Sequence, residues 1–298
     1  MYVFPAGTVL GGIYYNRAIW QSAGLSESEK DYPKTWDDLG RLAQHLTVRK
    51  NGTVQRWGMN QSTLFFAIAL EMYYQQGVYA FSPDGRTSQM NNPQMIKAIQ
   101  THASFVTKYR AGSFTGTDFF TLLSQGKNAM TWAYPWVPAA LKGGSSKVEV
   151  GAFGLPTFTG RTTPAEGFKQ VDGFFTVMAS ASPAARDTAF HFLQWLFLTG
   201  DRTKTALALT DFDGALPAYK PAQALAKGVG LDVILQRKSR AVPVGDYPPA
   251  VSDPMDKAMQ QIETAGVQPS VALAQAQHTV NHALALRQYR FTERDYRF

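Results

Sequence analysis

Gln125-Gly126-Lys127-Asn128-Ala129-Met130-Thr131-Trp132-Ala133-Tyr134-Pro135-Trp136 is the stretch of this chain that says most about its fold. Gly126 opens a turn into a predicted strand at residues 129–131, and the strand ends in a loop that Pro135 stiffens. The loop gathers two tryptophans and a tyrosine. A flat aromatic ring can cover the apolar C–H face of a sugar while polar groups satisfy its hydroxyls. Core and binding roles fit Trp132 equally well, whereas the position of Trp136 after the strand favours binding.

Outward from this stretch, strands alternate with helices. The predicted strands cover residues 9–15, 129–131, 148–155 and 174–178. Helix starts are indicated by capping residues or by proline at the first helical position, at Thr35 with Asp38, at Asn92-Pro93, at Ser182-Pro183 and at Pro269-Ser270. The apolar run 62–76 predicts a buried helix, and the proline-rich residues 241–254 predict a loop. This alternation predicts an α/β fold.

Composition narrows the possible functions. The chain has 298 residues, of which 45% are hydrophobic, so it can build a large core. It has no cysteine, which excludes disulfides, thiolate metal sites and cysteine nucleophiles. The net charge of +7 comes from scattered basic residues, which indicates a solvated surface rather than a nucleic-acid site. The first residues lack the basic and apolar regions of a signal peptide, and no apolar stretch is long enough to span a bilayer.

The sequence carries no G-x-S-x-G, H-E-x-x-H, P-loop or G-x-G-x-x-G motif. His278 and His282 are four residues apart, but no acidic residue or cysteine is near them in sequence, so surface positions are favoured. Residues 211–214 (Asp-Phe-Asp-Gly) begin like a calcium loop but lack its later ligands, which favours a turn. We therefore expect a protein that is not an enzyme, with no catalytic residues, metal or cofactor.

Several segments, in this order and over nearly the whole chain, resemble the maltose-binding type of bacterial extracellular solute-binding protein. They are Gly12-Ile13-Tyr14-Tyr15-Asn16 with Ala23-Gly24-Leu25, Pro33 to Leu39, Gly126 to Trp136, Leu155 to Gly160, Asp172-Gly173, and Gly214-Ala215-Leu216-Pro217. The resemblance implies two α/β lobes of the periplasmic-binding-protein class, joined by crossing strands, with the ligand in the cleft between them. It also implies a monomer that captures a sugar for the membrane permease subunits of an ABC importer, in the periplasm or as a cell-surface lipoprotein.

The resemblance also assigns the site. It implies that Trp136 stacks on the sugar, that Phe65 and Phe66 form an aromatic cluster, and that Asp172, Gly173 and Tyr247 lie at the cleft. With Trp132 and Tyr134 from the loop, these are the expected substrate-binding residues.

In the family, the segment matching the first residues of this chain follows most of the first lobe. The resemblance therefore implies that most of this lobe, roughly one small domain, is absent here. Residues 1–11 would be the remnant of the first lobe and hinge, 12–166 the second lobe, 167–216 the returning first-lobe segment and 217–298 the second lobe's C-terminal helices. The remnant would expose the apolar face of the helix at residues 189–198.

Other interpretations stay open at this point. The same fold could bind a non-sugar solute such as a glycerol phosphate, for which Lys169 is the one cation near the expected cleft loops. The chain could equally be a truncated fragment without function. A glycosidase would use a carboxylate pair, and nothing in the sequence marks one. A nucleic-acid binder would show steeply salt-dependent binding.

Overall fold

The computed structural model describes residues 3–61, 66–161, 167–238, 241–243 and 247–291. For residues 3, 168–172 and 243 it describes only the backbone and not the side chains.

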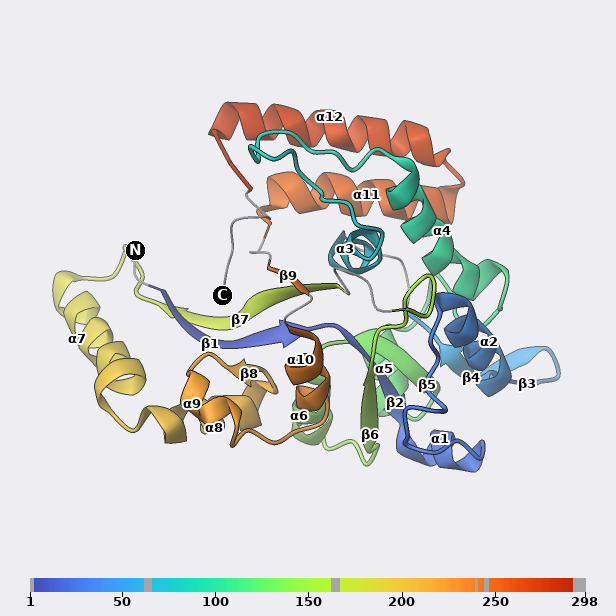
Figure 1. The fold of residues 1–298 in the computed structure, drawn as a ribbon, viewed down its shortest axis with the longest axis horizontal. Helices are drawn as coiled ribbons and strands as arrows, with labels where there is room; N and C mark the ends of the chain where they lie inside the picture. The colour runs from blue at the N-terminus through green and yellow to red at the C-terminus, as the bar shows by residue number, and fades with distance from the viewer. Residues whose placement is uncertain (1–2, 62–65, 162–166, 239–240, 244–246, 292–298) are drawn as a thin grey trace.

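The strands form two mixed sheets (Figure 1). The first has the order β8 (Leu216–Pro217), β1 (Val3–Leu10), β7 (Gly167–Thr176) and β9 (Ala241–Pro243). The second has the order β3 (Val48–Lys50), β4 (Thr53–Met59), β5 (Asn128–Ala133), β2 (Gly12–Asn16) and β6 (Val150–Gly154). Strand β4 runs parallel to β5 and β7 runs parallel to β9, while the other pairs are antiparallel.

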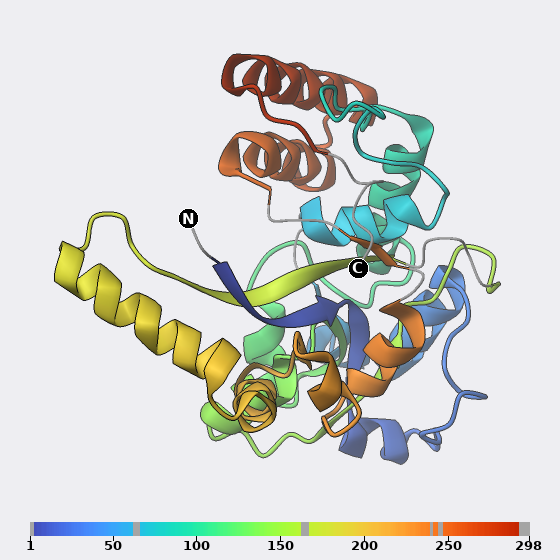
Figure 2. The same ribbon diagram turned by 60° about the vertical axis from the view of Figure 1, so that its left-hand side comes forward.

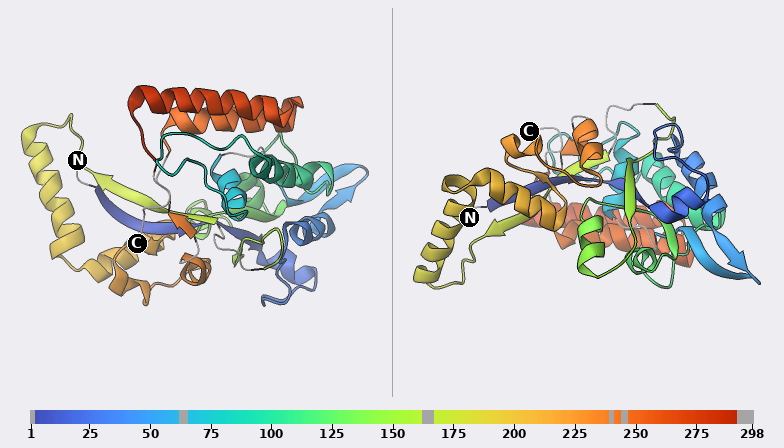
Figure 3. Two further views of the ribbon diagram at one scale, coloured as in Figure 1. Left: turned by 45° about the horizontal axis from the view of Figure 1, so that its top comes forward. Right: turned by 90° about the horizontal axis from the view of Figure 1, so that it is seen from below.

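One extended segment belongs to both sheets. Strand β1 passes into β2 through Gly11, and β7 runs antiparallel to β1 from the Val3–Thr176 pair to the Leu10–Lys169 pair. The resulting long ribbon carries the second sheet at one end and the helices after β7 at the other (Figure 3). These are the crossing strands that the sequence resemblance implies.

The helices surround the sheets. They are α1 (Arg17–Ser22), α2 (Trp36–Leu46), α3 (Phe66–Tyr74), α4 (Pro93–Thr107), α5 (Phe119–Ser124), α6 (Val137–Gly143), α7 (Pro183–Gln194), the π-helical turn η1 (Trp195–Thr199), α8 (Arg202–Asp213), α9 (Lys220–Gln223), α10 (Leu231–Arg237), α11 (Pro249–Ala265) and α12 (Pro269–Arg287). In Figures 1 and 2, α11 and α12 lie side by side over α3. The alternation of strands and helices confirms the predicted α/β class.

Helix starts follow the predicted local chemistry. The Thr35 hydroxyl accepts a hydrogen bond from Asp38 N, and the Asp38 carboxylate accepts one from Thr35 N, which is the predicted capping box. Asn92 and Ser182 cap α4 and α7, each followed by proline at the first helical position. These caps satisfy N–H groups that have no partner inside the helix.

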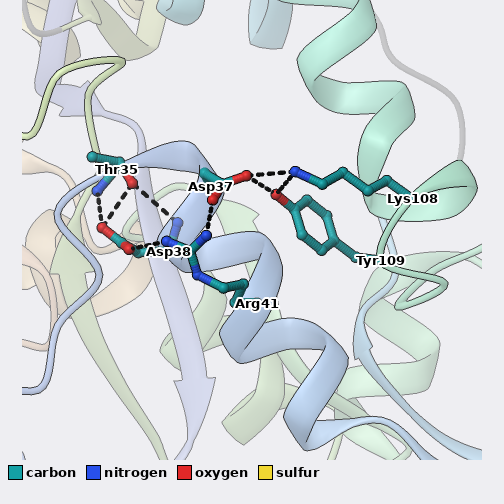
Figure 4. Close-up of polar contacts among 6 residues, drawn as sticks. All are labelled: Thr35, Asp37, Asp38, Arg41, Lys108 and Tyr109. Carbon is teal, nitrogen blue, oxygen red and sulfur yellow. Dashed lines mark hydrogen bonds and ion pairs between the residues drawn. The ribbon is translucent and has the colours of Figure 1, made fainter.

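A polar cluster ties α2 to the end of α4 (Figure 4). The Asp37 carboxylate accepts hydrogen bonds from Lys108 Nζ, at 2.6 Å, and from the Tyr109 hydroxyl, and Arg41 bridges Asp37 and Asp38. The hydrogen bond from Lys108 is the main cause that lowers the pKa of Asp37. The cluster fixes the position of α2, which packs on β4 and β5.

Residues 241–254 were predicted to be a loop, and this prediction is wrong. Residues 241–243 form β9, and α11 already begins at Pro249. Proline at the first helical turn costs no hydrogen bond, although Pro254 lies inside the helix. The helix is stabilised because Val251, Met255 and Met259 recur at helical spacing and are buried.

The helical segment at the far end of the ribbon, at residues 189–198, exposes apolar side chains, as expected. Phe197 packs inward on Phe4 and Phe175, with ring centroids 5.5 and 5.4 Å apart. Outward, Phe192, Trp195 and Leu198 are each more than half exposed. A contiguous stripe of this kind usually marks a surface that another segment or partner covers. No described helix is long and apolar enough to cross a membrane.

Candidate functional site

Trp136 lies between strand β5 of the second sheet and helix α6. It is the N-cap residue of that helix, directly after β5 and Pro135. Its ring is half-buried and packs near Phe120 and Phe119, with centroids 5.6 and 6.5 Å away. This packing orients the indole while leaving part of it accessible.

The turn after α8 contacts the Trp136 loop directly. Helix α8 ends at Gly214, which has a left-handed backbone (φ +77°) and donates its N–H to Thr210 O at 2.7 Å. A Cβ atom at this position would overlap the Pro135 carbonyl and lie 3.1 Å from Trp136 N. Only glycine therefore allows both the left-handed turn and this approach.

The same turn reaches the crossing strand β7. Asp213 Oδ1 accepts a hydrogen bond from Ala215 N at 2.9 Å. Its Oδ2 lies 3.2 Å from the position that a Cβ atom would take at Gly173, where φ is +63°. Trp136 and Gly173, both expected site residues, are thus brought to opposite sides of residues 213–214. Asp172 pairs with Gly7 through the backbone, and its side chain and that of Lys169 lie outside the described residues.

A second aromatic group forms around the start of α3. The rings of Phe66 and Tyr247 are 5.2 Å apart, and the Tyr247 hydroxyl lies 3.4 Å from that of Tyr74. Phe66 is buried and Tyr247 is partly buried. The tertiary structure thus brings together two of the expected residues that lie far apart in sequence. Phe65, expected beside Phe66, lies outside the described residues.

An acidic residue caps this second group. Asp256 Oδ1, from α11, accepts a hydrogen bond from Phe66 N at 2.5 Å. Burial raises the pKa of Asp256, and the nearby charge of Asp253 raises it further, while the hydrogen bond from Phe66 acts in the opposite direction. The negative charge of the Asp256 carboxylate also complements the positive, N-terminal end of the α3 dipole.

Trp132 and Tyr134 lie deeper than Trp136. Trp132 is 1% exposed and stacks on Trp36, with ring centroids 4.9 Å apart. Its backbone N–H and carbonyl are both bonded by the side chain of Gln61, at 2.8 Å each. The ring of Trp132 therefore belongs to the core, while its Nε1, without a hydrogen-bond partner among the described residues, lies near Gly11. Tyr134 is partly buried against the same core.

The sequence analysis did not assign Asp213 to the site. Residues 211–214 were considered as a calcium loop and interpreted as a turn, and Gly214 was noted only within the resemblance. The described residues contain no group of three or more His, Cys, Asp or Glu side chains arranged to hold a metal. Chemically, the partly exposed indole of Trp136 offers an aromatic face that suits binding of an apolar ligand surface.

The sequence pattern of the bacterial extracellular solute-binding proteins matches residues 2–202, about two thirds of the chain. The chain belongs to this family. No curated protein sequence matches this solute-binding protein significantly.

Solved structures share its fold. The maltose/maltodextrin-binding domain MalE from Bdellovibrio bacteriovorus, bound to maltotriose, is 19% identical with a TM-score of 0.75, and the match covers 95% of this chain and 73% of that one. An ABC substrate-binding protein from Listeria monocytogenes in complex with cycloalternan is 16% identical with a TM-score of 0.73, and the match covers 96% and 72%. UgpB from Mycobacterium tuberculosis in complex with glycerophosphocholine is 18% identical with a TM-score of 0.72, and the match covers 97% and 72%.

These likenesses confirm the expected two-lobe class. Nearly all of this solute-binding protein is matched, whereas more than a quarter of each relative has no counterpart in it, in agreement with a partial first lobe. The residue limits expected for the lobes stay a prediction.

Proposed function

We propose that this solute-binding protein captures a sugar or oligosaccharide in an aromatic-lined cleft between its lobes and hands it to the membrane subunits of an ABC importer. The observation that carries the proposal is the contact between the Trp136 loop, on the second sheet, and residues 213–214, beside the crossing strands. Trp136, an aromatic residue, thus lies next in sequence to a backbone contact with the turn after α8. Neutral sugars need an aromatic face and nearby polar groups because they present apolar faces and hydroxyl edges.

The site residues divide into two groups in this proposal. Trp136 covers a sugar face, with Asp172 and Gly173 of β7 at its border. Phe66 and Tyr247 form the second aromatic wall, and Phe65 extends it. Tyr134 and Trp132 support the Trp136 loop from the core side, where Trp132 is already stacked on Trp36.

Binding would be coupled to movement about the crossing strands. Strand β1 passes directly through Gly11 into β2, and we propose that this junction between the two sheets serves as the hinge. A ligand that touches both sides shifts the equilibrium towards the closed form by its preference for that form. We propose that the closed protein, acting as a monomer outside the cytoplasmic membrane, docks on the permease.

Isothermal titration calorimetry tests the sugar assignment. The sugars to be titrated are maltose, maltotriose, trehalose and xylobiose. Glycerol 3-phosphate is titrated as well, to test whether the protein binds an anionic solute instead. We expect heat with at least one sugar and weaker binding or none with the phosphate ester. Heat with the phosphate ester alone would overturn the sugar assignment and leave the family unchanged.

Trp136→Ala tests the position of the site. Loss of the stacking face should weaken sugar binding by about 10-fold or more, since each tenfold corresponds to about 1.4 kcal/mol. Trp57→Ala is the matched control, because Trp57 lies on β4 beside Arg49, outside the converging segments. Equal losses in both variants would mean that the effect is structural rather than local to the site.

A further inference from the structure

The segment that follows α12, residues 289–291, packs against a loop that lies far away in sequence. The C-cap residue Gln288 has a left-handed backbone (φ +51°), which ends α12. The segment then lies beside residues 81–88, where Phe291 N donates a hydrogen bond to Gly85 O at 2.9 Å. The backbones of the two segments are therefore in direct contact.

This contact is tight and leaves room only for glycine at position 85. Gly85 has φ +70°, and a Cβ atom there would lie 2.6 Å from Phe291 O and 2.7 Å from Phe291 N. Backbone atoms cannot rotate away as the end of a side chain can. The loop is itself tied to α12, because Ser88 N donates to Asn281 Oδ1 at 2.7 Å. The position of Phe291 is thus set by close packing against an anchored loop.

The ring of Phe291 belongs to an aromatic cluster around Tyr247. It stacks on Phe81, with ring centroids 4.9 Å apart, and lies 5.3 Å from the ring of Tyr247. Phe81 is buried, and its ring lies 5.7 Å from that of Tyr247. Phe66 approaches Tyr247 as well, at 5.2 Å. Aromatic pairs prefer definite relative orientations, so these neighbours restrict how the tyrosine ring can turn.

We infer that Phe291 is a positioning residue, which holds the Tyr247 ring in the orientation that receives the ligand. Phe291 acts through Tyr247 and not by touching the ligand itself. A ring that is already fixed loses little conformational entropy when a ligand packs on it. The inference rests on the proposed function, in which Tyr247 is part of the second aromatic wall, and it assigns the segment after α12 to the support of that wall.

Fluorine NMR of the protein with 3-fluorotyrosine at position 247 tests this placement without any ligand. The variants are Phe291→Ala and Phe291→Tyr, which keeps a ring. Phe158→Ala is the matched control, because Phe158 is also partly buried but packs under Lys97 of α4. The resonance should shift or broaden in Phe291→Ala, be largely restored in Phe291→Tyr and stay unchanged in Phe158→Ala. Circular dichroism and thermal melting establish that the variants are folded, and an unchanged resonance in folded Phe291→Ala overturns the inference.

A pair of glycine variants reaches the same contact through the backbone. Gly85→Ala displaces Phe291 without removing a ring, so it should change the resonance as Phe291→Ala does. Gly77 has a similar left-handed backbone (φ +75°), but no atom of the described residues lies within 4 Å of the position that its Cβ would take. Gly77→Ala should therefore leave the resonance unchanged. Equal changes in the two glycine variants would contradict the inference, because backbone strain alone would then explain them.

Isothermal titration calorimetry with the tightest-binding sugar of the four named above tests the effect on binding. We expect Phe291→Ala to raise the Kd about 3-fold or more and Phe158→Ala to change it less than about 2-fold, because loss of one aromatic pair is an effect of this size. An unchanged Kd together with a shifted resonance overturns the role of Phe291 in binding and leaves sugar binding intact. If the unsubstituted protein binds none of the four sugars, the proposed function fails, while the resonance still decides whether Phe291 positions Tyr247.

Discussion

Replacing Gly214 by alanine tests whether the turn after α8 is built against the Trp136 loop. Two costs arise at this position. A left-handed backbone costs a residue with a Cβ atom about 1–2 kcal/mol relative to glycine. The added methyl group also overlaps the Pro135 carbonyl, and insertion of a methyl into a packed contact costs about 1–3 kcal/mol more. The free energy of unfolding should therefore fall by about 2–5 kcal/mol.

Gly266→Ala separates these two costs. Gly266 ends α11 with φ +67°, the same left-handed role, but no atom lies within 4 Å of the position that its Cβ would take. This variant should lose only the conformational cost of about 1–2 kcal/mol.

Urea unfolding followed by tryptophan fluorescence measures both free energies. Because the backbone of the Trp136 loop must move to admit the methyl group, Gly214→Ala should also weaken sugar binding, whereas Gly266→Ala should not. Equal destabilisation in the two variants would refute the contact between the turn and the Trp136 loop.

Four further predictions concern stability and surface. Thr35→Ala should destabilise the protein by about 1 kcal/mol through loss of the α2 cap, measured by urea unfolding. Because the Thr35 hydroxyl lowers the pKa of Asp38, the stabilising effect of this carboxylate is present above about pH 4 and is lost as the pH falls further. The stability deficit of Asp38→Asn should therefore shrink between about pH 5 and pH 2, and a constant deficit would contradict the assigned role. Met255→Ala should cost about 2–5 kcal/mol because the side chain is fully buried in α11, and a loss below about 1 kcal/mol would show that the site is not core. Replacing Phe192 and Trp195 together by glutamine should reduce binding of a hydrophobic dye without lowering the thermal midpoint, since both side chains are more than half exposed. Unchanged dye fluorescence would mean that the dye binds elsewhere.

Local chemistry alone predicted many of the elements correctly. The capping box at Thr35, the Asn-Pro and Ser-Pro starts of α4 and α7, and the strand at residues 129–131, which β5 extends through Trp132 to Ala133, depend on neighbouring residues, which sequence displays directly. The hairpin of β3 and β4 was not predicted, although Asn51-Gly52 at its turn is the pair that favours two successive left-handed residues. The helix α11 was missed because its prolines suggested a loop, whereas burial of one face against α3, α4 and α12 outweighs the lost hydrogen bond.

Sequence alone therefore determined the α/β class, the helix ends and the aromatic character of the Trp136 loop, since each depends on residues within a few positions of one another. The tertiary structure decided which aromatic rings are covered and which acidic group stands beside them. Trp132 and Trp136 lie only four residues apart, and both were predicted to be in one loop, but Trp132 belongs to β5 and stacks on Trp36 in the core, whereas Trp136 follows the strand and is partly exposed beside the turn after α8. The turn after α8 comes against the Trp136 loop only because Gly214 carries no Cβ atom, and such an approach between distant segments leaves no local pattern in the sequence.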